Sequence, residues 1–328
     1  MTCKTHPLTP RAKIKSKLSV RFGACYMCVF LLVLFLKNTE ATVQWVSNGL
    51  DLCVKRLVPS LFPFMVVSSL MVLSGAGTRI FKVFERPVRC LFGVGAECCA
   101  PILLGWLSGF PVGARCASEL SRNRVIGAEE YKRVLCISST PSPAFLIGTV
   151  GSGMLKKPFC GVILYFLSLF SCLTVGVFFR IKSGSTDSVH SLSTANEHLG
   201  FARALTRAVT ESAQGMLYVC AFIVFFSAFL GTLEGTLAFL GLSNITATLI
   251  FCFFEMTSGI SRLCALNPPP LHLLALAAGW SGMSVHFQTA AMCSSEQSVN
   301  NHLFAYVISH IAKAAICFFL ALLIGIFV

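Results

Sequence analysis

Long apolar segments of this chain are broken near their middle by glycine, proline and serine, and this feature most limits the folds open to it. The clearest break lies at 105–115, Gly-Trp-Leu-Ser-Gly-Phe-Pro-Val-Gly-Ala-Arg. Glycine and proline interrupt helices and leave backbone groups without helical partners. In hydrocarbon, such backbone is tolerated only where protein buries it or where it lines a cavity. A similar break follows at 255–260, Glu-Met-Thr-Ser-Gly-Ile, and interrupted segments in both halves of a chain point to a transport site.

The composition places these segments in a membrane. Of the 328 residues, 55% are hydrophobic and 12% are charged, whereas soluble domains have about 25% charged residues. The net charge of +13 comes from short basic loops beside apolar segments, the positive-inside pattern of membrane proteins. We therefore predict an all-α, polytopic helical protein of the cell membrane. Its expected partners are anionic lipid headgroups, and no nucleic acid.

The sequence offers no support for metal, cofactor or enzyme chemistry. Most of the 16 cysteines lie inside apolar runs, where a thiol behaves as a small hydrophobic group. The pairs Cys25/Cys28 and Cys98/Cys99 do not stand in polar loops with zinc spacing. The chain has no Walker loop, dinucleotide fingerprint or H-E-x-x-H motif. We expect neither a cofactor nor a metal, and no enzymatic activity.

The chain is predicted to divide into four parts. Residues 1–40 contain a basic N-terminus, expected in the cytoplasm, and a first transmembrane helix. Residues 41–182 and 201–328 form two repeats, and the Ser/Thr-rich stretch 183–200 is the polar linker between them. At the start of the first repeat, 41–58 is expected to be an amphipathic helix at the membrane interface, with Trp45 as its anchor.

Both repeats are predicted to contain the same four parts in the same order: a plain span, a re-entrant hairpin with a Ser-Gly break, a broken helix and a closing span. In the first repeat these are 60–77, 90–120, 131–155 and 159–180, and in the second 208–233, 245–263, 271–292 and 302–328. Counting crossings from a cytoplasmic N-terminus gives the repeats opposite orientations. The first hairpin, with basic residues on both flanks, would enter from the cytoplasm and the second from outside. Inverted repeats with discontinuous helices are a transporter architecture.

The four breaks are expected to meet near the bilayer centre and to form a hydroxyl-rich, nearly uncharged binding site. The candidate substrate-binding residues are Ser108, Gly109 and Pro111; Ser139, Thr140 and Ser142; Glu255, Thr257 and Ser258; and Ser281, Ser284 and Gln288. Such a site suits a small polar solute, or an anion held by half-helix N-termini.

Five polar residues in apolar surroundings each allow two interpretations. Glu255 binds a proton, a cation or solute hydroxyls, or else it pairs with a base or caps a half-helix. Gln288 contacts solute or joins helices, and His286 is interpreted as a hydrogen-bonded packing residue. Arg115 is interpreted as a headgroup or loop charge. For Lys313, snorkelling to the interface is favoured over an ion pair with a glutamate.

The same segments resemble the sporulation integral membrane proteins of the Gate, or nucleoside-recognition, domain family. The resemblance runs from about residue 41 to the C-terminus and is carried by Leu-Phe-Pro-Phe at 61–64, the block 105–115, the break 138–148, Phe-Glu-Met-Thr-Ser-Gly at 254–259 and Ser-Val-His-Phe-Gln at 284–288. The family is similar to spore-maturation membrane proteins and, more distantly, to concentrative nucleoside carriers. The sequence departs from the family pattern at 139–143, where Asn-Thr-Ser-Gly-Pro is expected, and at 281–282, where Gly-Gly is expected.

Two functions follow from this resemblance and from the breaks. The first is a secondary transporter or permease of sporulation, for a nucleoside-like solute or a small anion, with a coupling ion. The alternative is a non-transporting membrane scaffold needed to assemble the spore cortex or coat. Polar residues converging at mid-membrane favour the transporter, because a scaffold gains nothing from their cost. Assembly into a homo-oligomer is compatible with both.

Overall fold

The computed structural model describes residues 10–183, 200–293 and 299–327, and every regular element in these ranges is helical. The helices are α1 (Pro10–Lys37), α2 (Thr39–Leu52), η1 (Cys53–Leu57), α3 (Val58–Leu73), α4 (Ala76–Phe81), η2 (Lys82–Phe84), α5 (Glu85–Phe92), η3 (Ala96–Cys98), α6 (Cys99–Ser108), α7 (Val112–Arg122), α8 (Ala128–Ser138), η4 (Ala144–Met154), α9 (Pro158–Ser183), α10 (Phe201–Phe239), α11 (Asn244–Phe254), α12 (Met256–Cys264), α13 (Leu271–Trp280), α14 (Gly282–Cys293) and α15 (Val299–Phe327).

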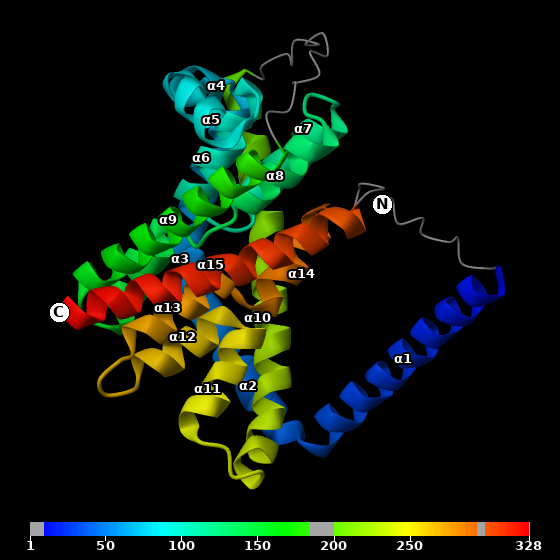
Figure 1. Ribbon diagram of the computed structural model, residues 1–328. Helices are drawn as coiled ribbons and strands as arrows, with labels where there is room; N and C mark the ends of the chain where they lie inside the picture. Colours follow the sequence, from blue (N-terminus) through cyan, green and yellow to red (C-terminus); the bar gives the residue numbers. More distant parts are fainter. Residues whose placement is uncertain (1–9, 184–199, 294–298, 328) are drawn as a thin grey trace.

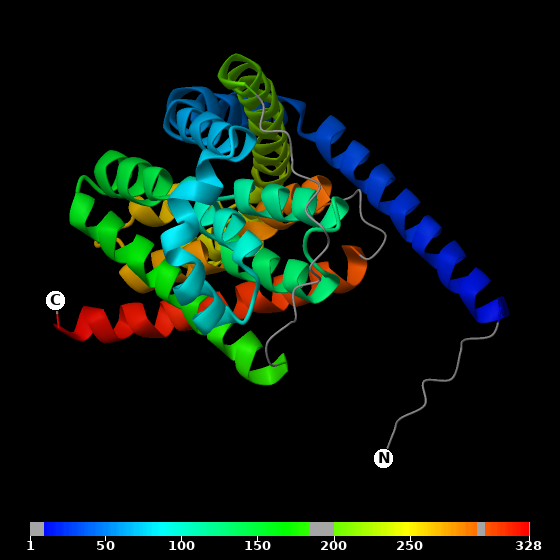
Figure 2. The ribbon, with the colours of Figure 1, turned by 90° about the horizontal axis from the view of Figure 1, so that it is seen from above.

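Four of these helices are long and apolar enough to cross a membrane: Thr39–Leu73, Pro158–Lys182, Phe201–Phe239 and His302–Gly325. Two further segments, Lys82–Phe92 and Ala96–Ser108, meet this criterion together but are bent by 105°. The prediction of a multi-pass, all-helical membrane protein is therefore confirmed. The first transmembrane helix expected within 1–40 coincides with part of α1. The apolar part of α1, Cys25–Lys37, is shorter than the four candidate spans. That helix extends away from the rest of the protein (Figures 1 and 2).

The first repeat begins differently from expectation, because α2, η1 and α3 form one continuous helix, Thr39–Leu73. The amphipathic helix predicted for 41–58 is thus not a separate interfacial element. Its Trp45 packs within the protein, because the indole lies against Gly231 of α10 and its ring centroid is 5.8 Å from that of Phe251. The polar residues of 41–58 suggest an interfacial helix, but the partner that buries one face of this helix lies about 180 positions later in the chain.

The opening helices of the two predicted repeats pack against each other in opposite directions. Early residues of Thr39–Leu73 contact late residues of α10, as Gly49 lies beside Ser227, whereas Met65 contacts Gly215 and Ser69 hydrogen-bonds Ser212. The closing helices α9 and α15 are also antiparallel neighbours. The thiol of Cys317 donates to the carbonyl of Leu167, whereas Lys313, earlier on α15, shares the carbonyl of Ser139 with Cys172, later on α9. In Figure 1, α10 stands upright, and α15 and its neighbour α9 run across the view.

Each half of the chain contains a short helical hairpin between these long helices. In the first, α6 and α7 fold back on each other around Gly109, so that a Cβ on Gly113 would lie 3.0 Å from the Cα of Gly105. In the second, α11 and α12 fold back around Glu255, and a Cβ on Gly259 would lie 2.5 Å from the Cα of Cys252. Close backbone contact of this kind needs small residues.

A broken helix follows each hairpin, where the sequence predicts one. In the first repeat α8 ends at Ser138, and η4 starts at Ala144 with the wide turns of a π-helix. In the second repeat α13 and α14 are separated at Ser281, which has a left-handed backbone with φ of 73°. Hairpin and broken helix thus recur in the same order in both halves. Residues 184–199 of the predicted linker lie outside the described residues.

Candidate functional site

Residues of both hairpins and both broken helices line one small pocket of about 40 Å³. Ser108 and Gly109 come from the first hairpin, and Pro141 and Ser142 from the first broken helix. The second half contributes Glu255 and two following residues from its hairpin, and Val285 and Gln288 from α14. Leu57 and Leu61 close one wall, and Val219 and Ile223 of α10 close another. The cavity therefore lies at the junction of the two halves.

Within each half, the hairpin turn lies directly on the broken helix. A Cβ on Gly109, whose φ is +74°, would lie 2.6 Å from the backbone nitrogen of Ser142. A Cβ on Gly282, whose φ is +80°, would lie 2.8 Å from the backbone nitrogen of Met256. Only glycine combines a left-handed backbone with such an approach, so these residues hold each pair of breaks together.

Two tryptophans, one in each half, reinforce this arrangement by joining the hairpin to the broken helix. The indole of Trp106, near the end of α6, donates to the carbonyl of Ile137 near the end of α8, at 2.9 Å. The indole of Trp280, at the end of α13, donates to the carbonyl of Phe253 near the end of α11, at 2.9 Å. In both halves an indole thus satisfies a carbonyl beside a break, where the helical partner of that carbonyl is missing.

Glu255 is 1% exposed, and its side chain caps α12. One carboxylate oxygen accepts from the backbone N–H of Thr257 at 2.9 Å, and the other accepts from that of Ser258 at 2.6 Å. The half-helix capping anticipated as one of its alternatives is therefore present. None of the ion pairs in the described chain includes Glu255. The group also lines the cavity, so capping and contact with a bound species are both open to it.

Six of the twelve predicted site residues line this cavity: Ser108, Gly109, Ser142, Glu255, Thr257 and Gln288. The other six do not line it: Pro111, Ser139, Thr140, Ser258, Ser281 and Ser284. Several hydroxyl groups of both sets serve the helices themselves. Ser139 donates to the carbonyl of Leu135, Ser281 donates to that of Ala278, and Ser142 accepts from the backbone N–H of Phe145. Gln288 donates to Ser284 on its own helix, so the side chain does not join two helices through this bond.

The snorkelling interpretation of Lys313 is wrong, because the side chain is buried and forms no ion pair with any residue that the structure describes. It is 2% exposed, and its Nζ donates to the carbonyl oxygens of Ser139 at 2.7 Å and Cys136 at 3.1 Å. It also lies 3.1 Å from Nε2 of His310. One sequence signal could have indicated this contact: His310 and Lys313 are three residues apart within the last apolar span, so they lie on the same face of a helix.

His286 packs among aromatic rings, as expected, but without the expected hydrogen bond. Its ring centroid lies 4.5 Å from that of Trp280, 5.4 Å from that of Tyr306 and 5.0 Å from that of His310. Neither ring nitrogen has a hydrogen-bond partner among the described residues, although the side chain is only 6% exposed. Buried polar groups are rarely left in this state unless they have a role or meet water.

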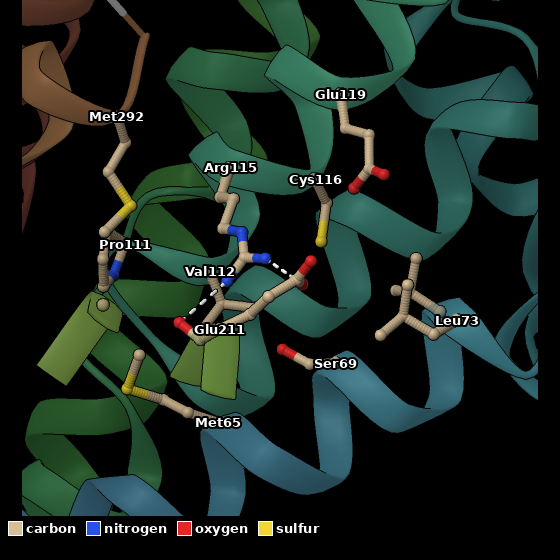
Figure 3. A pocket seen from close by; sticks show the side chains of 12 residues that line it. Met65, Ser69, Leu73, Pro111, Val112, Arg115, Cys116, Glu119, Glu211 and Met292 are labelled. Carbon is tan, nitrogen blue, oxygen red and sulfur yellow. Dashed lines mark hydrogen bonds and ion pairs between the residues drawn. The ribbon is translucent and has the colours of Figure 1, made fainter. Parts of the chain in front are cut away.

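Arg115 is the second charge whose interpretation changes. Its guanidinium group forms an ion pair with Glu211 and donates to the carbonyl of the same residue at 3.2 Å (Figure 3). Glu211 also pairs with Arg207, at 2.6 Å. Arg115 is therefore not a free loop charge, because it ties the first hairpin to α10. The pair lies in a separate pocket that also contains Pro111, two residues beyond the Gly109 break.

Comparison with known proteins gives one relative. The chain is 26% identical over 304 residues to the sporulation integral membrane protein YlbJ of Bacillus subtilis strain 168, covering 81% of this chain and 74% of the relative. No protein-family model matches the chain, so the Gate assignment stays a resemblance of motifs. No solved structure matches it either.

Proposed function

We propose that this multi-pass membrane protein acts in sporulation as a secondary transporter or permease, not as an enzyme, and that its solute binds at the cavity where the four breaks meet. The observation that carries the proposal is that residues from both hairpins and both broken helices line a single pocket. The role in sporulation is taken from the relative's name. A small polar molecule or a small anion fits a lining of hydroxyl, amide and carboxylate groups beside half-helix ends.

The proposal includes two inverted repeats, with hairpins that are re-entrant from opposite faces and an N-terminus in the cytoplasm. Two observations support the inversion: the opening helices of the repeats are antiparallel to each other, and so are the closing helices α9 and α15. Inverted repeats around a central site allow one half to rock against the other and to open the cavity to each side in turn.

Thermal unfolding of the purified protein with candidate solutes tests the transport function. We expect one class among nucleosides, nucleobases and small carboxylates to raise the Tm, because a ligand present at 100 times its Kd stabilises by about 2.7 kcal/mol. The other classes serve as controls for non-specific effects. No shift with any class would instead support the scaffold alternative.

Labelling from one side of the membrane tests the inversion. Asn123, after the first hairpin, and Asn267, after the second, are exposed and can be replaced singly by cysteine. The background protein carries serine at the exposed cysteines Cys25, Cys28 and Cys90. In intact vesicles of one orientation, a membrane-impermeant maleimide is expected to label only one of the two positions until the vesicles are opened. Labelling of both positions from the same side would refute the inverted arrangement.

A further inference from the structure

Lys313 is a buried cation without an acidic partner. The side chain is 2% exposed, and none of the ion pairs in the part of the chain that the structure describes involves it. An uncompensated charge in a membrane protein interior is costly and is retained where it serves a function. Backbone dipoles must therefore stabilise this ammonium group.

The carbonyl groups that Lys313 contacts belong to the end of a broken helix. α8 ends at Ser138, and Nζ of Lys313 lies 3.1 Å from the carbonyl oxygen of Cys136 and 2.7 Å from that of Ser139. The C-terminal carbonyls of a helix carry partial negative charge. In discontinuous transporter helices, such carbonyls coordinate the coupling cation. The ammonium group of Lys313 thus occupies a position suited to a small monovalent cation.

The third contact of Lys313 connects its ammonium group to the second broken helix. Its Nζ lies 3.1 Å from Nε2 of His310, whose Nδ1 lies 3.2 Å from the carbonyl oxygen of Gly279 and 3.3 Å from the hydroxyl of Ser281. An ammonium group only donates, so Nε2 accepts and Nδ1 carries the hydrogen that is donated to Gly279 or Ser281. Lys313 and His310 therefore connect the break at Ser139 with the break at Ser281.

This connection lies directly behind the cavity wall. Phe110 lines the cavity, and its ring centroid is 6.1 Å from that of His310. Pro141, also in the wall, follows Ser139 by two residues. A change in the bond between Lys313 and Ser139 would therefore act on the wall itself.

The titratable groups around the ammonium group carry no fixed negative charge. Those that face it from the helices packed on α15 are the thiols of Cys136 on α8 and Cys172 on α9, and the imidazole of His286 on α14. From α15 itself they are the groups of Tyr306, His310 and Cys317. The part of α13 next to this cluster, Gly279 to Ser281, has no titratable side chain. No carboxylate in the described chain holds the proton on Lys313.

We propose that Lys313 carries a tethered cation, which fills the cation site of the first broken helix in place of a metal ion, and that binding and release of a proton at Nζ supply the coupling ion. The coupling role rests on the proposed transport function. With the proton bound, the ammonium group holds both breaks in the arrangement seen here. When Nζ gives up its proton to water or to a neighbouring imidazole, the resulting amine carries no charge, its bonds to the two carbonyls weaken, and the break at Ser139 loosens.

Hydrogen exchange of the full-length protein in lipid nanodiscs tests this proposal. The readout is backbone exchange over 136–146, corrected for the intrinsic effect of pH, from about pH 6 to about pH 10. In the parent, exchange is expected to accelerate with rising pH. In Lys313→Met it should be about tenfold faster than in the parent at low pH and independent of pH, because two charge-assisted hydrogen bonds are absent. In Lys313→Arg it should stay slow at every pH, because a guanidinium group keeps its proton. A pH response that persists in the methionine variant would overturn the proposal.

A chemical rescue keeps the test decisive if the arginine does not fit. Lys313→Ala removes three methylene groups and the ammonium group, which are the atoms of propylammonium. Propylammonium chloride is expected to slow exchange over 136–146 in this variant towards the parent rate. Tetramethylammonium, which cannot donate hydrogen bonds, should have no effect. Equal responses to both salts would refute a specific ammonium site. Neither measurement uses a solute, so a flat solute screen with positive results here would reject the transport function alone.

Discussion

Replacement of Glu255 by glutamine is expected to reduce the solute-induced rise in Tm strongly while leaving a folded protein. The amide keeps one oxygen that can accept a backbone N–H, but it loses the second acceptor and the negative charge. We expect a loss of about 1–2 kcal/mol of stability, typical for a helix cap or one hydrogen bond to a charged group. Loss of a carboxylate from the cavity wall is expected to weaken solute or cation binding at least about tenfold, since such a bond is worth about 1.5–3 kcal/mol. Thermal unfolding with and without solute measures both effects.

Glu129 provides a matched control, because it also lies in the first turn of a helix, α8, but its side chain is 56% exposed. Glu129→Gln should change neither the stability by more than about 0.5 kcal/mol nor the response to solute. Should the Glu255→Gln protein bind solute and support sporulation as the parent does, Glu255 would be a helix cap only, and the site as proposed would be wrong.

The substitution Gly105→Ala is expected to prevent the first hairpin from packing. A Cβ at this position would lie 2.2 Å from the carbonyl oxygen of Ser138 and 2.8 Å from its Cβ. Backbone cannot move aside as the end of a flexible side chain can, so the cost should reach or exceed the upper end of overpacking penalties, about 3 kcal/mol. We expect the Tm to fall by about 5 °C or more, or the protein to be degraded in cells. Exchange over 136–146 should also accelerate, because Ser138 lies directly before the break.

Gly235→Ala is the control for this substitution. Gly235 lies within the long helix α10, and an added Cβ would have no neighbour within 4 Å. Alanine has the higher helix propensity, so this variant should be as stable as the parent or more stable by up to about 1 kcal/mol. Similar losses in the two variants would show that the contact between α6 and α8 is not tight.

The positions of the breaks were predicted well from local sequence. Gly109, Glu255 and Ser281 each lie where the structure interrupts a helix, and the prolines 141 and 143 lie in the break after α8. These predictions succeed because glycine and proline act on the backbone at their own position, whatever surrounds them. The repeated order of hairpin and broken helix followed from the same signals.

The roles of charged residues could not be predicted in this way. Lys313 was interpreted as snorkelling and Arg115 as a loop charge, yet the first binds carbonyl groups 174 and 177 positions earlier and the second pairs with Glu211, 96 positions later. The same limit applies to Trp45, which packs against Gly231 of α10. A local sequence pattern shows the charge and hydrogen-bonding groups of a side chain, but it does not show which distant residues will contact them.

By itself, the sequence determined that this is a membrane protein of helices broken at defined points, because apolar length and helix-breaking residues act locally. Only the tertiary structure decided that the breaks of both halves share one cavity, and that a lysine from the last helix lies behind its wall. These features depend on antiparallel packing of helices distant in sequence, through glycine contacts that no single segment encodes. The free-energy cost of burying the Lys313 charge depends on the groups around it. Those groups come from distant parts of the chain, so the sequence alone could not show them.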